Sequence, residues 1–386
     1  MKEENQKTTE IRDNIVFDPE IRLFERKFID CYVDTGIVRG RSSVLSHILA
    51  YLLIHESLTQ SDFKTLSNLY FENHKKKGIS SGLISKILSE LVERKIGITC
   101  SKVLGAKNKF IYQINSDVEK LVLNSFQLAV INSRHTISFL SEKIECFQTM
   151  EISPFSKTKL SSYRPNPSFA FSRLEKLIDC HKQDVKNISA LLKLPVSKPK
   201  KVQQQKRKNI HFSGDFCTFI SEIIQYLANS LQYMNLKSDY RVLFIFFILY
   251  EELTQESLRE ITLHFESVNH DSKIFTGMSA GAISLGLNYL LELGVISRFK
   301  KPNERRYYYQ MESVSYSHFY FLRESIQSYF KWIPTMEDWL KELSERAPQL
   351  QARSGYNRMV KIITQFLNLK EFLSSSLEFL NNELET

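Results

Sequence analysis

Two short segments of this chain place a serine in the spacing that serine hydrolases use for catalysis. Residues 78–82 (GISSG) and 277–281 (GMSAG) both fit G-x-S-x-G, the pattern of a strained turn that presents a nucleophilic serine between a strand and a helix. The preceding residues, Lys75 to Lys77 and His270 to Lys273, are polar and do not read as the buried strand that such a turn needs. No alternation of strands and helices supports an α/β sheet. We therefore expect no catalytic residues and no enzyme.

The same serines are well placed to begin helices. Ser80 and Ser279 stand where an N-cap hydroxyl accepts hydrogen bonds from the free amides of the first helical turn. The apolar pairs expected to form hydrophobic staples around these caps are Ile79 with Ile84 and Met278 with Ile283. Both segments are therefore predicted to open amphipathic helices.

The polar face of each predicted helix carries short side chains. In the first helix these are Ser81, Ser85, Lys86 and Ser89, and in the second they are Ala280, Ser284 and Asn288. Gly82, Gly281 and Gly286 are expected to reduce the bulk of this face further. A helix that enters the major groove of DNA needs such a face, because phosphates and base edges come close to its backbone.

The motif belongs to a longer internal repeat. Leu58-Thr59-Gln60 and Leu253-Thr254-Gln255 precede it, and the two copies are offset by 195 residues at these anchors and by 199 at the glycines. In each copy a leading helix and a more apolar helix come first, and a short helix follows the anchor, with Ser61 as its expected N-cap in the first copy. The helix that opens at the serine is followed by a two-stranded hairpin. This order predicts a mainly α fold with small β-wings, built from two tandem winged helix-turn-helix domains.

The predicted boundaries follow from periodicity and from turn residues. The leading helices are expected at 20–33 and 216–234, and the apolar helices at 42–55 and 238–251. The hairpins are expected at 97–114 and 296–311, and the second should turn at Pro302-Asn303. Long helices suited to dimerisation are expected at 117–150, 169–192, 316–332, 337–346 and 356–383. The predicted domains are residues 1–192 and 210–386, joined by a basic linker at 193–209.

Composition narrows the class of protein. The chain has 52 Lys and Arg against 43 Asp and Glu, a net charge of +9 that suits a polyanionic partner. Its most apolar run, 242–250, is too short to cross a bilayer, and the polar N-terminus is unlike a signal peptide, so we expect a cytoplasmic protein without a membrane partner. The cysteines are far apart in the sequence and have no histidines at ligand spacing. Neither a metal site nor a disulfide framework is therefore expected. They are Cys31, Cys100, Cys146, Cys180 and Cys217. No fingerprint of a cofactor site is present.

Each copy contains, in this order, Leu-Thr, a short helix, S-x-G-x-I-S, a Leu-x-x-Leu helix, a basic hairpin and Tyr-Gln (Tyr112-Gln113 and Tyr309-Gln310). This order resembles that of MarR-type winged-helix regulators, with the GbsR-like branch the most similar. In that branch a lysine usually follows the first serine, whereas Ser81 and Ala280 stand there in this chain. The resemblance implies binding of double-stranded DNA, repression by occupation of an operator, and a dimer, here fused into one polypeptide. Its two recognition helices would enter successive major grooves about 10 bp apart.

The basic wings complete the predicted DNA-binding set, because Lys and Arg at a hairpin tip suit phosphate contacts. The candidate residues are Ser80, Ser81, Ser85, Lys86, Ser89, Lys107, Lys109, Ser279, Ser284, Asn288, Lys300, Lys301, Arg305 and Arg306.

Three alternatives stay open at this point. Residues 278–293 contain no Lys or Arg, which favours a tandem module that binds a protein partner instead of DNA. The aromatic residues of 307–339 either pack the helical platform or form a cage for a small effector that the sequence does not identify. The fused pair could also form a homodimer through its long helices.

Overall fold

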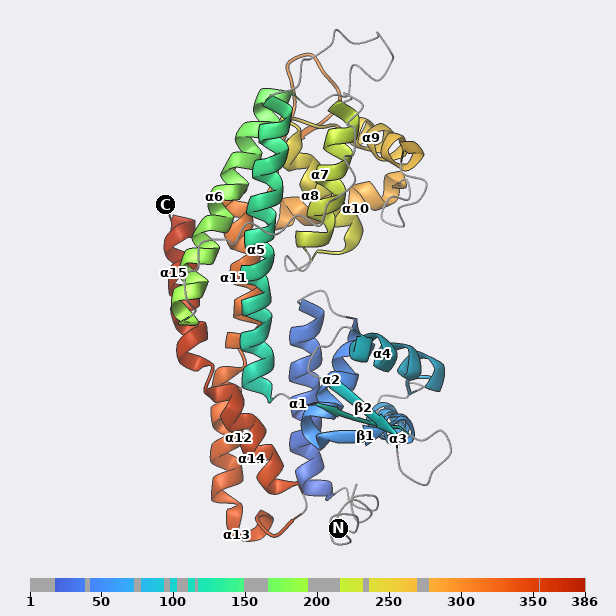
Figure 1. The fold of residues 1–386 in the computed structure, drawn as a ribbon, viewed down its shortest axis with the longest axis vertical. Coiled ribbons are helices and arrows are strands. Elements are labelled where there is room, and N and C mark those ends of the chain that lie inside the picture. Colours follow the sequence, from blue (N-terminus) through green and yellow to red (C-terminus); the bar gives the residue numbers. More distant parts are fainter. Residues whose placement is uncertain are drawn as a thin grey trace. The chain divides into compact units, whose positions relative to one another are not determined.

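A computed structural model of the chain describes residues 18–38, 42–72, 78–93, 98–102, 110–114, 117–148, 166–193, 216–231, 236–268, 278–353 and 355–385. These residues form helices and a few short antiparallel strands (Figure 1), which confirms the predicted mainly α class with small β-wings.

The chain divides into two compact units, and each of them draws on both halves of the sequence. Unit 1 comprises residues 1–124 and 327–374, and unit 2 comprises residues 125–326 and 375–386. The sequence domains 1–192 and 210–386 therefore describe the repeat and not the compact units. The predicted linker, 193–209, lies outside the described residues except for Lys193.

Unit 1 contains the first helix-turn-helix and helices from the end of the chain. Its elements are α1 (Pro19–Val38), α2 (Ser43–His55), β1 (Ser57–Thr59), α3 (Gln60–Glu72), α4 (Ser81–Glu93), β2 (Ile98–Lys102), β3 (Phe110–Ile114), α12 (Ile333–Glu345), α13 (Ala347–Leu350) and α14 (Tyr356–Leu367). The strands form an antiparallel sheet in the order β1-β3-β2, with Leu58 and Cys100 both opposite Tyr112. Helix α1 packs on α2, and α14 contacts both.

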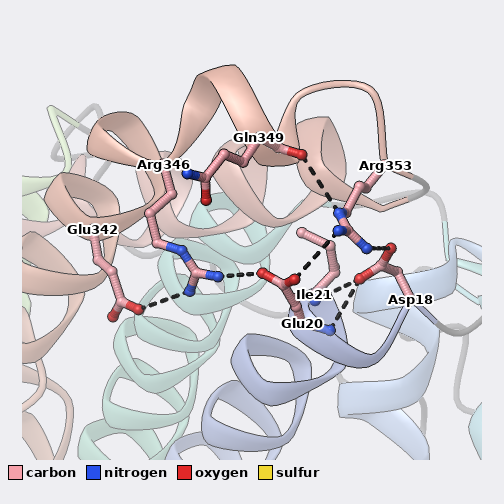
Figure 2. A network of polar contacts seen from close by, with 7 residues as sticks. All are labelled: Asp18, Glu20, Ile21, Glu342, Arg346, Gln349 and Arg353. Carbon is pink, nitrogen blue, oxygen red and sulfur yellow. Dashed lines mark hydrogen bonds and ion pairs between the residues drawn. The ribbon is translucent and has the colours of Figure 1, made fainter.

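A polar network ties the start of α1 to α12 and α13 within unit 1 (Figure 2). Asp18 accepts hydrogen bonds from the amides of Glu20 and Ile21 and so caps α1, where Pro19 fills the first helical position. Arg353 pairs with Asp18 at 2.7 Å and with Glu20 at 3.2 Å. Arg346 bonds Glu20 as well, and its other terminal nitrogen lies 3.3 Å from Glu342. The hydrogen bond from Arg353 lowers the pKa of Asp18 below its usual value.

Unit 2 contains the second helix-turn-helix and the long helices of the first sequence half. Its elements are α5 (Val118–Gln148), α6 (Pro167–Leu191), α7 (Phe216–Ser230), α8 (Ser238–Leu249), α9 (Gln255–Val268), α10 (Ala280–Glu292), β4 (Ser297–Phe299), β5 (Tyr308–Gln310), α11 (Val314–Phe330) and α15 (Lys370–Glu385). The division between the units falls inside α5, α11 and α15.

The core of unit 2 explains the most apolar run of the sequence. Residues 242–250 are buried on every side because α8 is surrounded by α6, α7 and α10. Across the described residues, no helix is both long and apolar enough to span a bilayer. Many aromatic rings of the last third also lie in cores, among them Phe319 and Phe321 of unit 2 and Tyr329 and Trp339 of unit 1.

Two predictions about helices were wrong. Residues 356–383 do not form one helix: α14 ends at Leu367, and α15 begins at Lys370 after a turn at Asn368 and Leu369. Ser61 is not an N-cap, because α3 already begins at Gln60.

Candidate nucleic-acid interface

The first helix of each helix-turn-helix is capped in the same way. In unit 1 the amide of Asp62 donates to Thr59 Oγ1 (3.3 Å), and the amide of Thr59 donates to the Asp62 carboxylate (2.7 Å). In unit 2 the amide of Ser257 donates to Thr254 Oγ1 (3.0 Å), and the amide of Thr254 donates to Ser257 Oγ (2.8 Å). This is the reciprocal geometry of a capping box. The threonine of the Leu-Thr-Gln anchor therefore caps the helix in the place predicted for Ser61.

The glutamine of each anchor holds the helix that follows. Gln60 Nε2 donates to the carbonyl of Ser81 at 3.0 Å, and Gln255 Nε2 donates to the carbonyl of Ala280 at 3.2 Å. Each bond joins the first residue of one helix to the first residue of the next. The repeat is therefore present in the hydrogen bonds as well as in the sequence. These bonds hold the start of α4 on α3 and the start of α10 on α9.

The serines of the G-x-S-x-G segments are helix caps, as predicted. The amide of Leu83 donates to Ser80 Oγ at 3.3 Å, and the amide of Ala282 donates to Ser279 Oγ at 3.2 Å. The predicted staple residues are buried in both copies: Ile79, Ile84, Met278 and Ile283. The caps leave the N-terminal turns of α4 and α10 at the surface.

Helices α4 and α10 expose the same face. Residues 80–93 and 279–292 have the same degree of burial at every position but one, where Leu83 is exposed and Ala282 is half-buried. On this face the predicted contact residues Ser80, Ser81, Lys86, Ser89, Ser279 and Asn288 are exposed, and Ser85 and Ser284 are half-buried. The residues expected on this face therefore lie at the surface of both helices, wholly or in part.

Gly286 does not belong to this face. It is buried in the contact between α10 and α8, and a Cβ there would lie 2.4 Å from Leu243 Cδ1 and 3.1 Å from Tyr240 Cδ1. Gly286 therefore allows the two helices to approach closely. Gly82 and Gly281, in contrast, are exposed, and a Cβ would have space at both.

Leu285 also lies on this face, although it was not among the residues predicted from the sequence. Its side chain is 64% exposed, at the position that Lys86 occupies in α4. The 199-residue offset that aligns the glycines could have identified it. An exposed leucine at this place can contact the methyl group of thymine or an apolar surface of another protein.

The wing of unit 2 concentrates basic groups next to tyrosines. The tip turns at Pro302 and Asn303, as predicted, with Asn303 in the left-handed region (φ 64°). Arg298 and Lys300 each lie 4.6 Å from the centre of the exposed Tyr307 ring. These cation–π contacts orient the charges while leaving them at the surface.

The predicted wing residues differ in how much of their charge is available. Lys300 and Arg305 are exposed, and neither forms an ion pair within the described part of the chain. Lys301 instead bonds Glu252, which raises the pKa of Lys301, and Arg306 pairs with Glu304 at 2.8 Å. Lys107 and Lys109 lie outside the described residues. Lys300 and Arg305 are therefore the strongest candidates for phosphate contacts.

Comparisons with known proteins add little to this geometry. No protein-family model matches the chain, and no curated protein matches it. One solved structure, described as a crystal structure of a transcriptional regulator, aligns with 42% of this chain and 98% of its own length, at 16% sequence identity and a TM-score of 0.27. A similarity of this size supports no assignment of function.

Proposed function

We propose that the chain is a transcriptional regulator that binds double-stranded DNA through α4 and α10. The observation that carries this proposal is the repeated exposed face of these helices. Each face has short polar side chains, begins at a serine cap, and is held by a glutamine from the preceding helix. A helix of this kind fits the major groove without steric obstruction. We interpret the chain as a MarR-like, GbsR-like regulator in which a tandem repeat replaces a dimer and which represses by occupying an operator.

The wing of unit 2 supports this proposal through charge. Lys300 and Arg305 are exposed on the hairpin that follows the recognition helix, where they would contact phosphates and fix the register of the helix on DNA. Asn288 is the best candidate for reading a base, because its exposed amide can bond the N6 and N7 atoms of adenine together.

A second candidate function is recognition of a protein partner. The exposed Leu285 favours it, since α10 offers an apolar side chain where α4 offers Lys86. In that case α10 would bury its face against another protein, and the basic wing would contribute little.

Selection of random duplex DNA by the full chain at about 150 mM salt tests the two functions. Enrichment of a defined motif supports DNA recognition, whereas recovery of no motif, with binding that vanishes at moderate salt, supports the protein-binding module.

Variants of unit 2 then test the assigned roles on the selected site. Asn288→Ala is expected to cost about 1–3 kcal/mol of discrimination at one base position. Arg305→Ala should weaken binding to all sequences and reduce the salt slope by about 0.9. Lys341→Ala, which removes an exposed positive charge from α12 of unit 1, is the matched control and should change neither property. An equal effect of Lys341→Ala and Arg305→Ala would contradict a specific role for the wing.

A further inference from the structure

Three ligating side chains meet in the core of unit 2, away from the proposed DNA-binding face. His181 and Asp184 lie one turn apart on α6, and His318 comes from α11. One donor atom from each of the three lies within 4.8 Å of the other two. All three side chains are at least 95% buried. Sequence spacing could not reveal this cluster, because His318 follows Asp184 by 134 residues.

The separations between the donor atoms fit a shared metal ion. His318 Nε2 lies 2.7 Å from Asp184 Oδ2, and His181 Nδ1 lies 3.7 Å from the same oxygen. Metal–ligand bonds of about 2.1 Å in tetrahedral geometry place neighbouring donors about 3.4 Å apart, and octahedral geometry places them about 3.0 Å apart. The two observed distances bracket these values, and all three donor atoms lie within 4.8 Å of one another, so adjustment of the side chains would bring them around one ion.

The carboxylate of Asp184 supplies a second, independent observation. Asp184 Oδ2 contacts the histidines, but no group in the described residues donates a hydrogen bond to Oδ1, which is fully buried. A buried carboxylate oxygen without a donor is costly, and a cation at the site would remove that cost. The bonding of the apparent His–Asp pair is therefore incomplete without a further positive group.

The surroundings prepare the histidines for coordination. The two rings meet edge to face with centroids 4.9 Å apart, and Ser133 Oγ of α5 lies 3.0 Å from His181 Nδ1.

We propose that His181, Asp184 and His318 form a binding site for one divalent first-row transition metal ion, such as Zn²⁺. Two imidazoles and one carboxylate suit this class and not Mg²⁺ or Ca²⁺, which prefer oxygen donors. Water or Ser133 would complete the coordination. This proposal does not depend on the proposed DNA-binding function.

The site joins two helices that both reach the wing of unit 2. Helix α11 begins four residues after β5 ends. Arg173 of α6 donates hydrogen bonds to the carbonyls of Met311 (2.6 Å) and Glu312 (3.0 Å), directly after that strand. A metal ion would therefore cross-link α6 to α11 behind the wing and stabilise this arrangement by its binding energy.

Titration of the full chain tests the proposal. Chelator-treated protein is titrated with Zn²⁺ against a chromophoric chelator, and we expect one tightly bound ion per chain and a thermal midpoint that rises with Zn²⁺. Asp184→Asn should weaken binding by about 100-fold or more, because it removes a ligand. Asp179→Asn is the matched control, since Asp179 is an exposed aspartate on the same helix, and its affinity should equal that of the wild type.

Two results would overturn the metal site. The first is a folded wild-type chain that takes up no Zn²⁺, Co²⁺ or Ni²⁺, and the second is equal affinity in the wild type and in Asp184→Asn. X-ray absorption of the zinc-loaded wild type needs no variant that might misfold. Nitrogen and oxygen neighbours with imidazole scattering support the site, whereas sulfur neighbours would assign the ion to cysteines and contradict the proposal.

Discussion

His55 shows how a single side chain can couple the stability of unit 1 to pH. It is the last residue of α2, and burial lowers its pKa to about 3, with a smaller contribution from the positive charge of Arg358. An unfolded histidine has a pKa of about 6.5. At pH values between these two pKa values, the histidine is protonated in the unfolded chain and neutral in the folded chain. The free energy of unfolding therefore falls as the pH decreases below about 6.5.

His55→Gln is expected to remove this pH dependence. Each pH unit below 6.5 costs the wild type about 1.4 kcal/mol through this group, so from pH 7 to pH 5 the variant should lose about 2 kcal/mol less stability than the wild type. Urea unfolding followed by tryptophan fluorescence measures it, because the only tryptophans of the chain, Trp332 and Trp339, belong to unit 1. His135→Gln, at an exposed histidine of α5, should leave the wild-type slope unchanged. Equal slopes for both variants would show that His55 is protonated in the fold.

At the residue scale, the features that could be predicted are those that depend on residues close in sequence. The caps at Ser80 and Ser279 follow from the residues of the next turn, and they were found as predicted. The ion pair between Lys301 and Glu252 joins residues 49 positions apart and was not predictable from the wing alone. The cluster around His318 depends on the packing of α6 against α11, so spacing along the chain carried no sign of it.

At the scale of elements, the contact between α8 and α10 depends on one glycine. In a helix, Gly→Ala gains about 1 kcal/mol of helix propensity where space is available. Gly286→Ala also forces a methyl group against Leu243, and overpacking of a core costs about 1–3 kcal/mol. We expect a net loss of stability in unit 2.

Gly281→Ala, five residues earlier on the same helix, separates the two contributions. A Cβ at Gly281 meets little except the cap hydroxyl of Ser279 at 3.9 Å, so this variant should gain helix propensity without a clash. Thermal unfolding followed by circular dichroism should place Gly286→Ala about 1–3 kcal/mol below Gly281→Ala. Tryptophan fluorescence should report an unchanged unit 1 in both. Equal stability of the two variants would mean that α8 and α10 separate at no cost.

Helix boundaries were predictable where the sequence carries a cap or a break. The serine caps located the starts of α4 and α10 to within one residue, whereas α12 begins four residues before the predicted 337. The separation of α14 from α15 was missed because Asn368 and Leu369 include neither glycine nor proline, and the apolar periodicity continues through them. Tertiary packing decides such a break, since Leu369 is buried although its neighbours on both sides are exposed.

At the scale of the whole molecule, the two sequence halves exchange helices. Unit 1 combines α1 to α4 with α12 to α14, and unit 2 combines α7 to α10 with α5 and α6. Periodicity identified these helices but not their partners, because an amphipathic stripe specifies that a face is buried and not which helix covers it. The apolar surfaces of each half are therefore completed only by the other half.

This exchange predicts that the halves remain associated after the connection between them is cut. A specific protease site inserted between Pro199 and Lys200 would yield residues 1–199 and 200–386.

Within unit 1, the packing of α14 on α1 and α2 and the pairs Arg358–Glu25 and Arg353–Asp18 join the two fragments. Within unit 2, the packing of α6 on α8 and the pair Lys143–Glu222 do the same. The cleaved chain should therefore elute as one species in gel filtration and separate only in denaturant. A protease site placed before residue 18 is the control, since cleavage there leaves all the described residues on one chain. Separation of the fragments in native buffer would mean that each half folds by itself, and it would contradict the division into these two units.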